Sequence, residues 1–156
     1  MKMNLGELEI NGVLFGRNTG IDEVINNPRF KSYVNNDGSF RSFTAEHVNV
    51  DEYEFNIRIL FINNQIAKIE LVPINLEIED PGYPDENYQL TKKKMADSFL
   101  RKYLGNPSKE REDVLLYEFD WGTVSSVIFL SGRNEYTGGF IVFSYNQKIT
   151  EDTKAR

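Results

Sequence analysis

The stretch from Val114 to Tyr145 constrains the fold of this chain more than any other. It contains three runs rich in aliphatic, β-branched and aromatic residues, broken by two turn signals, the first of which is the corner Asp120-Trp121-Gly122. Such runs bounded by turn residues predict β-strands, and the short connections between them permit antiparallel pairing but not parallel pairing. We therefore expect an antiparallel meander. Both of its faces carry apolar residues, so one face should pack on a helix and the other should be at least partly covered.

An earlier run, residues 55–72, predicts a hairpin whose register follows from its pattern. Its odd-numbered apolar residues should be buried. A two-residue loop would pair apolar residues with charged ones, because a slip of one residue turns every side chain to the other face. A three-residue loop, Asn63-Asn64-Gln65, instead gives the apolar pair Ile59–Ile69 and the charged pair Arg58–Glu70. We expect the second arrangement.

Two segments have the spacing of amphipathic helices. The longer, about 92–104, follows a capping Thr91 and ends at Gly105, and its lysines should lie largely off the apolar stripe. The shorter, about 20–27, begins with Thr19 and Asp22 as a weak capping box and ends before Pro28. Turn-forming residues also predict a short hairpin or one kinked strand over residues 8–15, and a hairpin over residues 30–43.

These elements predict a single α+β domain over residues 1–145. We expect a mainly antiparallel sheet of hairpins, packed by the helix at about 92–104 and by the short N-terminal helix at about 20–27. A chain of 156 residues is the length of one ordinary domain. The polar segment 146–156 should be a disordered C-terminal tail.

Composition excludes several classes of function. The chain has no cysteine, which removes disulfides, thiolate nucleophiles and cysteine-based zinc sites. A net charge of −6 disfavours nucleic acid as a partner. No apolar run reaches the length of a signal peptide core or a membrane span, so we expect a cytoplasmic protein without a membrane partner. No motif indicates a cofactor.

Four polar features are candidate sites, and for each an ordinary structural role is favoured. His47 is the only histidine and has no marked catalytic partner. The loop Gly16-Arg17-Asn18-Thr19-Gly20 precedes a helix and could bind an anion, but it matches no phosphate-binding motif. Lys92-Lys93-Lys94 predicts a solvated helix face or an acidic partner. The acidic loop 77–86 offers calcium ligands without the spacing of a calcium loop; its acids are Glu77, Glu79, Asp80, Asp85 and Glu86.

Asp120 also lacks a marked catalytic partner, and its carboxylate should accept backbone N–H bonds in its turn. We therefore expect no catalytic, cofactor or metal residue. A binding surface is the remaining possibility, since tyrosine and tryptophan dominate protein interfaces. The aromatic residues in or beside loops are Tyr83, Tyr88, Trp121 and Tyr136. Packing is the favoured alternative for Trp121.

Residues 95–145 resemble small bacterial α+β domains of the immunity-protein or inhibitor type. The resemblance is carried by the helix ending in Tyr103-Leu104-Gly105-Asn106-Pro107, by Phe119-Asp120-Trp121-Gly122, by Ser125-Ser126, and by Gly138-Gly139-Phe140-Ile141-Val142 with Tyr145. It implies a helix packed on an antiparallel sheet and brings no catalytic residues.

Two functions from different classes remain open. The first is a non-enzymatic protein-binding module, of immunity type, whose acidity would help it capture a basic partner. The second is a small hydrolase or a small-ligand-binding protein that uses the acidic loop or Asp120. A cleft with convergent carboxylates would favour the second function, and an acidic surface with exposed aromatics the first. The sequence leans away from an enzyme and leaves the oligomeric state open.

Overall fold

The computed structural model describes residues 1–34, 38–74, 76, 78–79, 81–82, 85–130 and 136–147. The described elements are, in chain order, η1 (Met3–Leu5), β1 (Leu8–Ile10), β2 (Val13–Phe15), α1 (Ile21–Ile25), β3 (Lys31–Val34), β4 (Phe40–Val50), β5 (Tyr53–Ile62), β6 (Gln65–Pro73), α2 (Glu86–Leu104), β7 (Lys109–Glu110), β8 (Val114–Phe119), β9 (Gly122–Leu130) and β10 (Tyr136–Tyr145). The predicted α+β class with an antiparallel sheet is confirmed. The tail residues 148–156 lie outside this description.

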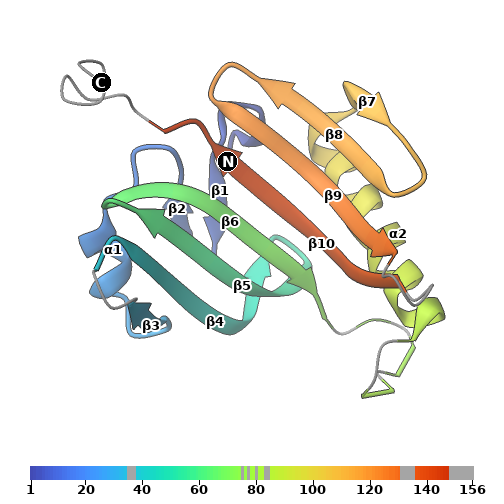
Figure 1. Cartoon of the computed structure of the whole chain (residues 1–156), viewed down its shortest axis with the longest axis horizontal. Helices are drawn as coiled ribbons and strands as arrows, with labels where there is room; N and C mark the ends of the chain where they lie inside the picture. The colour runs from blue at the N-terminus through green and yellow to red at the C-terminus, as the bar shows by residue number, and fades with distance from the viewer. Residues whose placement is uncertain are drawn as a thin grey trace.

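Eight of the strands form one antiparallel sheet in the order β3-β4-β5-β6-β10-β9-β8-β7, and β1 and β2 form a separate hairpin. Figure 1 shows α2 lying behind β8, β9 and β10, while the β1–β2 hairpin and α1 lie behind the other half of the sheet. Both groups of elements cover the same face. No helix among the described residues covers the opposite face, which is turned toward the viewer in Figure 1.

The core lies between the sheet and this covering layer. The odd-numbered residues of β5 point into it, and the most buried members are Phe55, Ile59 and Phe61, each at 0% exposure. The predicted register is also confirmed, because Ile59 pairs with Ile69 and Arg58 with Glu70. Alternation therefore predicted both the buried face and the strand pairing.

The predicted loop of this hairpin is wrong, although the register is right. Ile62 pairs with Gln65, so the turn contains only Asn63 and Asn64, with φ of 50° and 63°. Asparagine tolerates the positive φ of a type I′ turn better than most residues. Leu60 pairs with Lys68 and Phe61 with Ile66, so the return strand bulges at Ala67. The bulge supplies the extra residue that keeps apolar side chains on the inner face.

The helix α2 begins six residues before the predicted position of about 92, at Glu86. Its N-cap is Asp85, whose Oδ2 accepts the N–H of Tyr88 at 2.9 Å, so Thr91 lies inside the helix. The predicted end at Gly105 is confirmed, with φ of 74°.

The prediction that Lys92-Lys93-Lys94 forms a solvated face is wrong for Lys93. This side chain is only 5% exposed, and its Nζ pairs with Asp97 at 2.6 Å. The carbon stem of Lys93 is therefore buried, while its ammonium group is paired with a carboxylate.

The short helix α1 is present within the predicted range but is capped differently. Its N-cap is Gly20, whose N–H donates to Glu23 Oε2 at 2.9 Å. Thr19 instead accepts the N–H of Gly16 at 2.7 Å through Oγ1. The Gly16–Gly20 loop is thus closed on itself by a side chain that would otherwise cap the helix.

The meander of β8, β9 and β10 is confirmed, and its inner face packs under α2. No described helix or strand lies over its outer face, so the expected partial cover comes, among the described residues, from the side chains of the face itself. The apolar side chains there only shield one another, and Val114, Leu116, Val127 and Val142 are half-buried. The sheet ends at β7, where Glu110 pairs with Arg101 of α2 at 2.5 Å and Lys109 pairs with Glu118 at 3.3 Å.

Candidate functional site

Trp121 is part of the core and not of an exposed surface, which corrects its place among the candidate binding residues. Its indole is 7% exposed and stacks on Phe119 with ring centroids 5.2 Å apart. Its Nε1 donates to the carbonyl oxygen of Asn4 at 2.9 Å. Its ring also lies against Gly6, where an added Cβ would come within 3.0 Å. Trp121 therefore anchors the N-terminal segment to the meander.

The remaining candidate aromatics form no common surface in the part of the chain that is described. Tyr88 is half-buried in the first turn of α2, and Lys92 Nζ lies 5.6 Å from the centre of its ring. Tyr136 begins β10, but its side chain is not described, and Tyr83 lies outside the described residues. Their role in binding stays a prediction.

His47 has a structural position at a bulge of β4. Ala45 pairs with Ile57 and Val48 with Phe55, which leaves Glu46 and His47 as the bulged residues. The guanidinium of Arg29 donates to both of their carbonyl oxygens, at 3.2 and 3.1 Å. The imidazole is exposed, and its Nδ1 lies 2.8 Å from Glu54 Oε1.

Asp120 is exposed at the turn between β8 and β9. Its backbone carbonyl oxygen accepts a hydrogen bond from the side-chain Nδ2 of Asn146 at 2.9 Å, so Asp120 uses its main chain in this turn. The expected bond to its carboxylate is absent from the described contacts.

The acidic loop does not form a metal site from the residues that are described. Asp85 caps α2, whereas Glu77 and Asp80 lie outside the described residues. Within the described ranges, no three His, Cys, Asp or Glu side chains lie close enough together to hold a metal ion.

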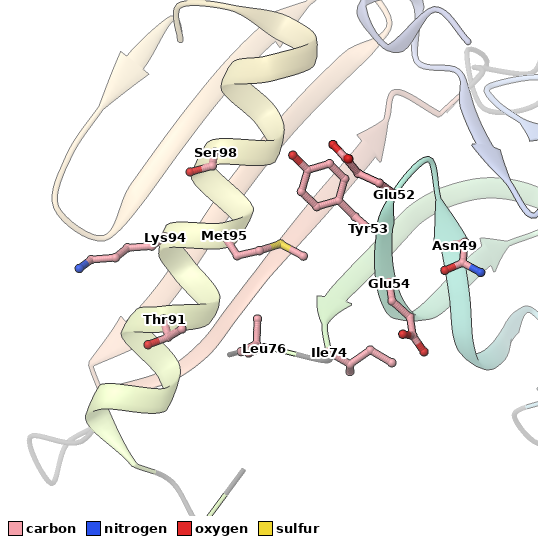
Figure 2. A pocket seen from close by; sticks show the side chains of 10 residues that line it. All are labelled: Asn49, Glu52, Tyr53, Glu54, Ile74, Leu76, Thr91, Lys94, Met95 and Ser98. Atoms are coloured by element: carbon pink, nitrogen blue, oxygen red, sulfur yellow. The ribbon is translucent and has the colours of Figure 1, made fainter. Parts of the chain in front are cut away.

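The best candidate site is a cleft between α2 and the start of β5, which we call the α2–β5 cleft. Its volume is about 540 Å³, within the range of small-ligand and side-chain pockets. Figure 2 shows its lining, which comes from four separate stretches of the chain. The lining residues are Asn49, Glu52, Tyr53, Glu54, Ile74, Leu76, Thr91, Lys94, Met95 and Ser98.

The α2–β5 cleft has an apolar floor and an acidic side. The floor consists of Tyr53, Ile74, Leu76 and Met95, all half-buried. Tyr53 is held in place by Phe99 of α2, whose ring meets it edge-on at 5.0 Å. In Figure 2, Met95 points into the cleft, whereas the side chain of Lys94 points away from it. The acidic side is formed by Glu52 and Glu54, which contact Lys102 and His47.

The turn between β4 and β5 forms an acidic ridge, which we define as Asp51 and Glu52. Lys102 Nζ lies 2.6 Å from Glu52 Oε1 and 4.0 Å from Asp51 Oδ2. The Tyr103 hydroxyl donates to Asp51. Burial, helped by this hydrogen bond, raises the pKa of Tyr103 to about 12, and the hydrogen bond to Glu52 raises the pKa of Lys102. Two consecutive residues of α2 thus hold the acidic ridge in one position.

A second hollow lies on the other side of the acidic ridge. Its volume is about 490 Å³, and its lining includes Glu9, Asn11, Asp51 and Tyr103. Asn49 lines both this hollow and the α2–β5 cleft. The acidic ridge therefore stands between two hollows, each with carboxylates of its own.

This arrangement was not predicted from the sequence. Its residues come from β4, β5, the segment after β6, and α2, and none belongs to a local motif. The only local signal is the run of acids at Asp51, Glu52 and Glu54 around the aromatic Tyr53.

Comparisons of the chain with protein-family models, with curated proteins and with solved structures find no match. In the described part of the chain, no helix combines the length and the apolar character needed to cross a membrane. The function must therefore be argued from geometry.

Proposed function

We propose that this protein is a non-enzymatic binding module whose partner is a basic protein. The observation that carries the proposal is the acidic ridge, held by α2 between two hollows. A partner would meet carboxylates that are already in position, so little ordering would be lost on binding. Carboxylates clustered on one surface also steer a basic partner toward it. The net charge of −6 acts in the same direction.

An immunity-type protein that neutralises a basic toxin is a module of this kind. The resemblance of residues 95–145 to such bacterial domains supports this form of the proposal. A bacterial source and a cytoplasmic location belong to the same proposal; the second rests on the absence of cysteine.

The alternative function, a hydrolase or small-ligand-binding protein built on acidic residues, has weaker support. General acid–base chemistry needs two groups that converge on one substrate atom. The carboxylates of Glu52 and Glu54 point to different ends of the α2–β5 cleft in Figure 2. Each already has a partner, Lys102 for Glu52 and His47 for Glu54.

The test is affinity capture from cells that encode the protein, followed by reconstitution with the purified partner. The bait variant Asp51→Asn/Glu52→Gln removes the two charges of the acidic ridge while keeping side-chain size. The control Glu112→Gln/Glu118→Gln removes two exposed charges near β8. We expect the wild type and the control to bind one basic protein in a salt-sensitive manner, and the bait variant to bind it at least tenfold more weakly. Equal binding by all three, or hydrolytic turnover that the bait variant abolishes while remaining folded, would contradict the proposal.

A further inference from the structure

The face of the sheet opposite α2 carries a contiguous apolar area on β8, β9 and β10. Strand pairing places its members side by side, because Val127 pairs with Phe140 on one side and with Val114 on the other. The rings of Phe129 and Phe140 lie 6.1 Å apart. Phe129 is 54% exposed, and the other members are half-buried. We call this area the outer patch and define it as Val114, Leu116, Val127, Phe129, Phe140 and Val142.

The outer patch is neutral as well as apolar. Strands β9 and β10 contain no charged residue, so the middle of this face does not select a basic or an acidic partner. Figure 1 shows the face turned toward the viewer, with no described helix over it. Contiguous apolar side chains gain free energy when a partner removes them from water. The charges at the border of the patch indicate which partner this is.

A cation and a carboxylate lie at the two ends of one row across the sheet. Ser144 of β10 pairs with Lys68 of β6 and with Thr123 of β9. Thr123 in turn pairs with Glu118 of β8. The row therefore has Lys68 at one end and Glu118 at the other, and its midpoint lies between β9 and β10. Lys68 is exposed, and no described residue forms an ion pair with it. Glu118 lies 3.3 Å from Lys109, and its side chain remains 50% exposed.

We propose that the outer patch packs against the outer patch of a second copy of this chain, with a twofold axis that runs along the strands between β9 and β10. This axis places β6 of one copy over β8 of the other, so Lys68 faces Glu118 of the partner subunit, and the contact forms twice. It also places the apolar residues of β9 over those of β10. The strand directions of the two copies stay similar, as they do in sandwiches of aligned sheets.

The area of the face suits a dimer of this kind. The six strands from β5 to β7 in the sheet order cover roughly 700 Å², at about 3.3 Å per residue along a strand and about 4.8 Å between strands. A standard interface buries about 800 Å² on each partner. The charged residues of β6, β8, β9 and β10 are Lys68, Glu70 and Glu118. Glu70 is paired with Arg58 at 3.4 Å. Two copies can therefore meet here although each carries a net charge of −6.

This inference goes beyond the proposed function and does not depend on it. Asp51 and Glu52 of the acidic ridge contact Lys102 of α2, which lies on the other face of the sheet. Each copy in the dimer thus keeps its acidic ridge accessible to a basic partner. Dimerisation and partner binding can therefore fail separately.

The experiment is sedimentation equilibrium of the whole chain across the micromolar range. We expect a monomer–dimer equilibrium that Lys68→Glu or Glu118→Lys weakens at least tenfold, because each places like charges face to face. The double variant Lys68→Glu/Glu118→Lys exchanges the two ends of the row and should restore the dimer to within threefold of wild type. Arg17→Glu makes the same charge change in the exposed loop before α1 and should leave dimerisation unchanged.

A second pair of variants tests the apolar contact without changing any charge. Phe129→Ser should weaken the dimer at least fivefold, and little packing is lost inside the monomer because the ring is 54% exposed. Tyr33→Ser is the control, since this side chain is 65% exposed on β3, beyond the overlap of the two copies. A chain that stays monomeric throughout, whether another segment or a foreign protein then covers the face, would overturn the proposal. A dimer that neither charge reversal weakens, or that the double variant does not restore, would overturn it as well.

Discussion

The hydroxyl of Tyr103, near the end of α2, donates a hydrogen bond to the carboxylate of Asp51 in the turn between β4 and β5. The two residues are 52 positions apart in the chain. Together with the contact between Lys102 and Glu52, this bond connects the helical layer to the tip of a hairpin. The position of the acidic ridge therefore depends on the packing of α2 against this hairpin.

Stability should fall at alkaline pH because of this tyrosine. The folded pKa of Tyr103 is raised to about 12, whereas an unfolded tyrosine titrates at about 10. Below pH about 10 both states keep the proton, and the contribution to stability is complete. Above it the unfolded chain loses its proton first, so the free energy of unfolding falls until the folded pKa is reached. Burial also raises the pKa of Tyr145 and Tyr117, which adds to the same fall.

Denaturant unfolding of wild type and Tyr103→Phe at pH values from 7 to 11 checks this prediction. Tyr103→Phe should be less stable at pH 7 by about 1 kcal/mol, the usual net worth of one hydrogen bond. Its further loss above pH 10 should be smaller than that of wild type. Parallel curves for the two proteins would show that Tyr103 is not among the groups responsible.

Trp121 should behave as a core residue in solution. Its fluorescence should be shifted toward the blue and poorly quenched by acrylamide, since the indole is 7% exposed. Trp121→Phe removes the hydrogen bond to Asn4 and part of the ring, and should cost about 2 kcal/mol in thermal unfolding. Tyr33→Phe, at a side chain that is 65% exposed, is the matched aromatic control and should be near neutral. A Trp121→Phe protein as stable as wild type would contradict the packing described above.

Gly122 should not tolerate a side chain. A Cβ at this position would lie 1.9 Å from the carbonyl oxygen of Ser144, and the φ of 153° is already unfavourable for other residues. The obstacle is backbone of the neighbouring β10 and cannot rotate away, so Gly122→Ala should cost more than about 3 kcal/mol or prevent folding. Gly16→Ala is the control, because its nearest neighbour would be an ordinary contact at 3.6 Å. Soluble yield and circular dichroism of the two variants provide the comparison, and equal stability would refute the clash.

A substitution in the Asn63–Asn64 turn should make the protein more stable. Both residues have positive φ, and glycine is the residue that reaches such angles most easily at the second position of this turn. Asn64→Gly should therefore raise the free energy of unfolding by about 0.5 kcal/mol, and Asn64→Ala should lower it by about 1 kcal/mol. Differential scanning calorimetry of the two variants decides the matter. A shift of both melting temperatures in the same direction would show that the turn geometry is not limiting.

The sequence predicts well those features that depend on neighbours along the chain. The pairing of Ile59 with Ile69 follows from alternation in two adjacent strands, and the end of α2 at Gly105 follows from a glycine placed before Pro107. The fold class follows from the same two kinds of signal. In each case the residues that decide the structure lie within one hairpin or one helix.

Features decided by contacts between distant segments could not be predicted in the same way. The bulge at Ala67 has no distinctive residue, and the start of α2 depends on Asp85, one of several acids in its loop. The burial of Trp121 depends on Gly6 and Asn4, more than a hundred residues away. The α2–β5 cleft draws on four separate stretches, so no window along the chain contains it.

The short edge strand β7 limits the addition of further strands at one end of the sheet. Both of its residues are charged and already engaged, Lys109 with Glu118 and Glu110 with Arg101. A strand arriving at this edge would find only two residues to pair with, and both carry a charge, which disfavours edge-to-edge association. The meander is therefore a poor template for adding further strands, which protects it from polymerising at this end.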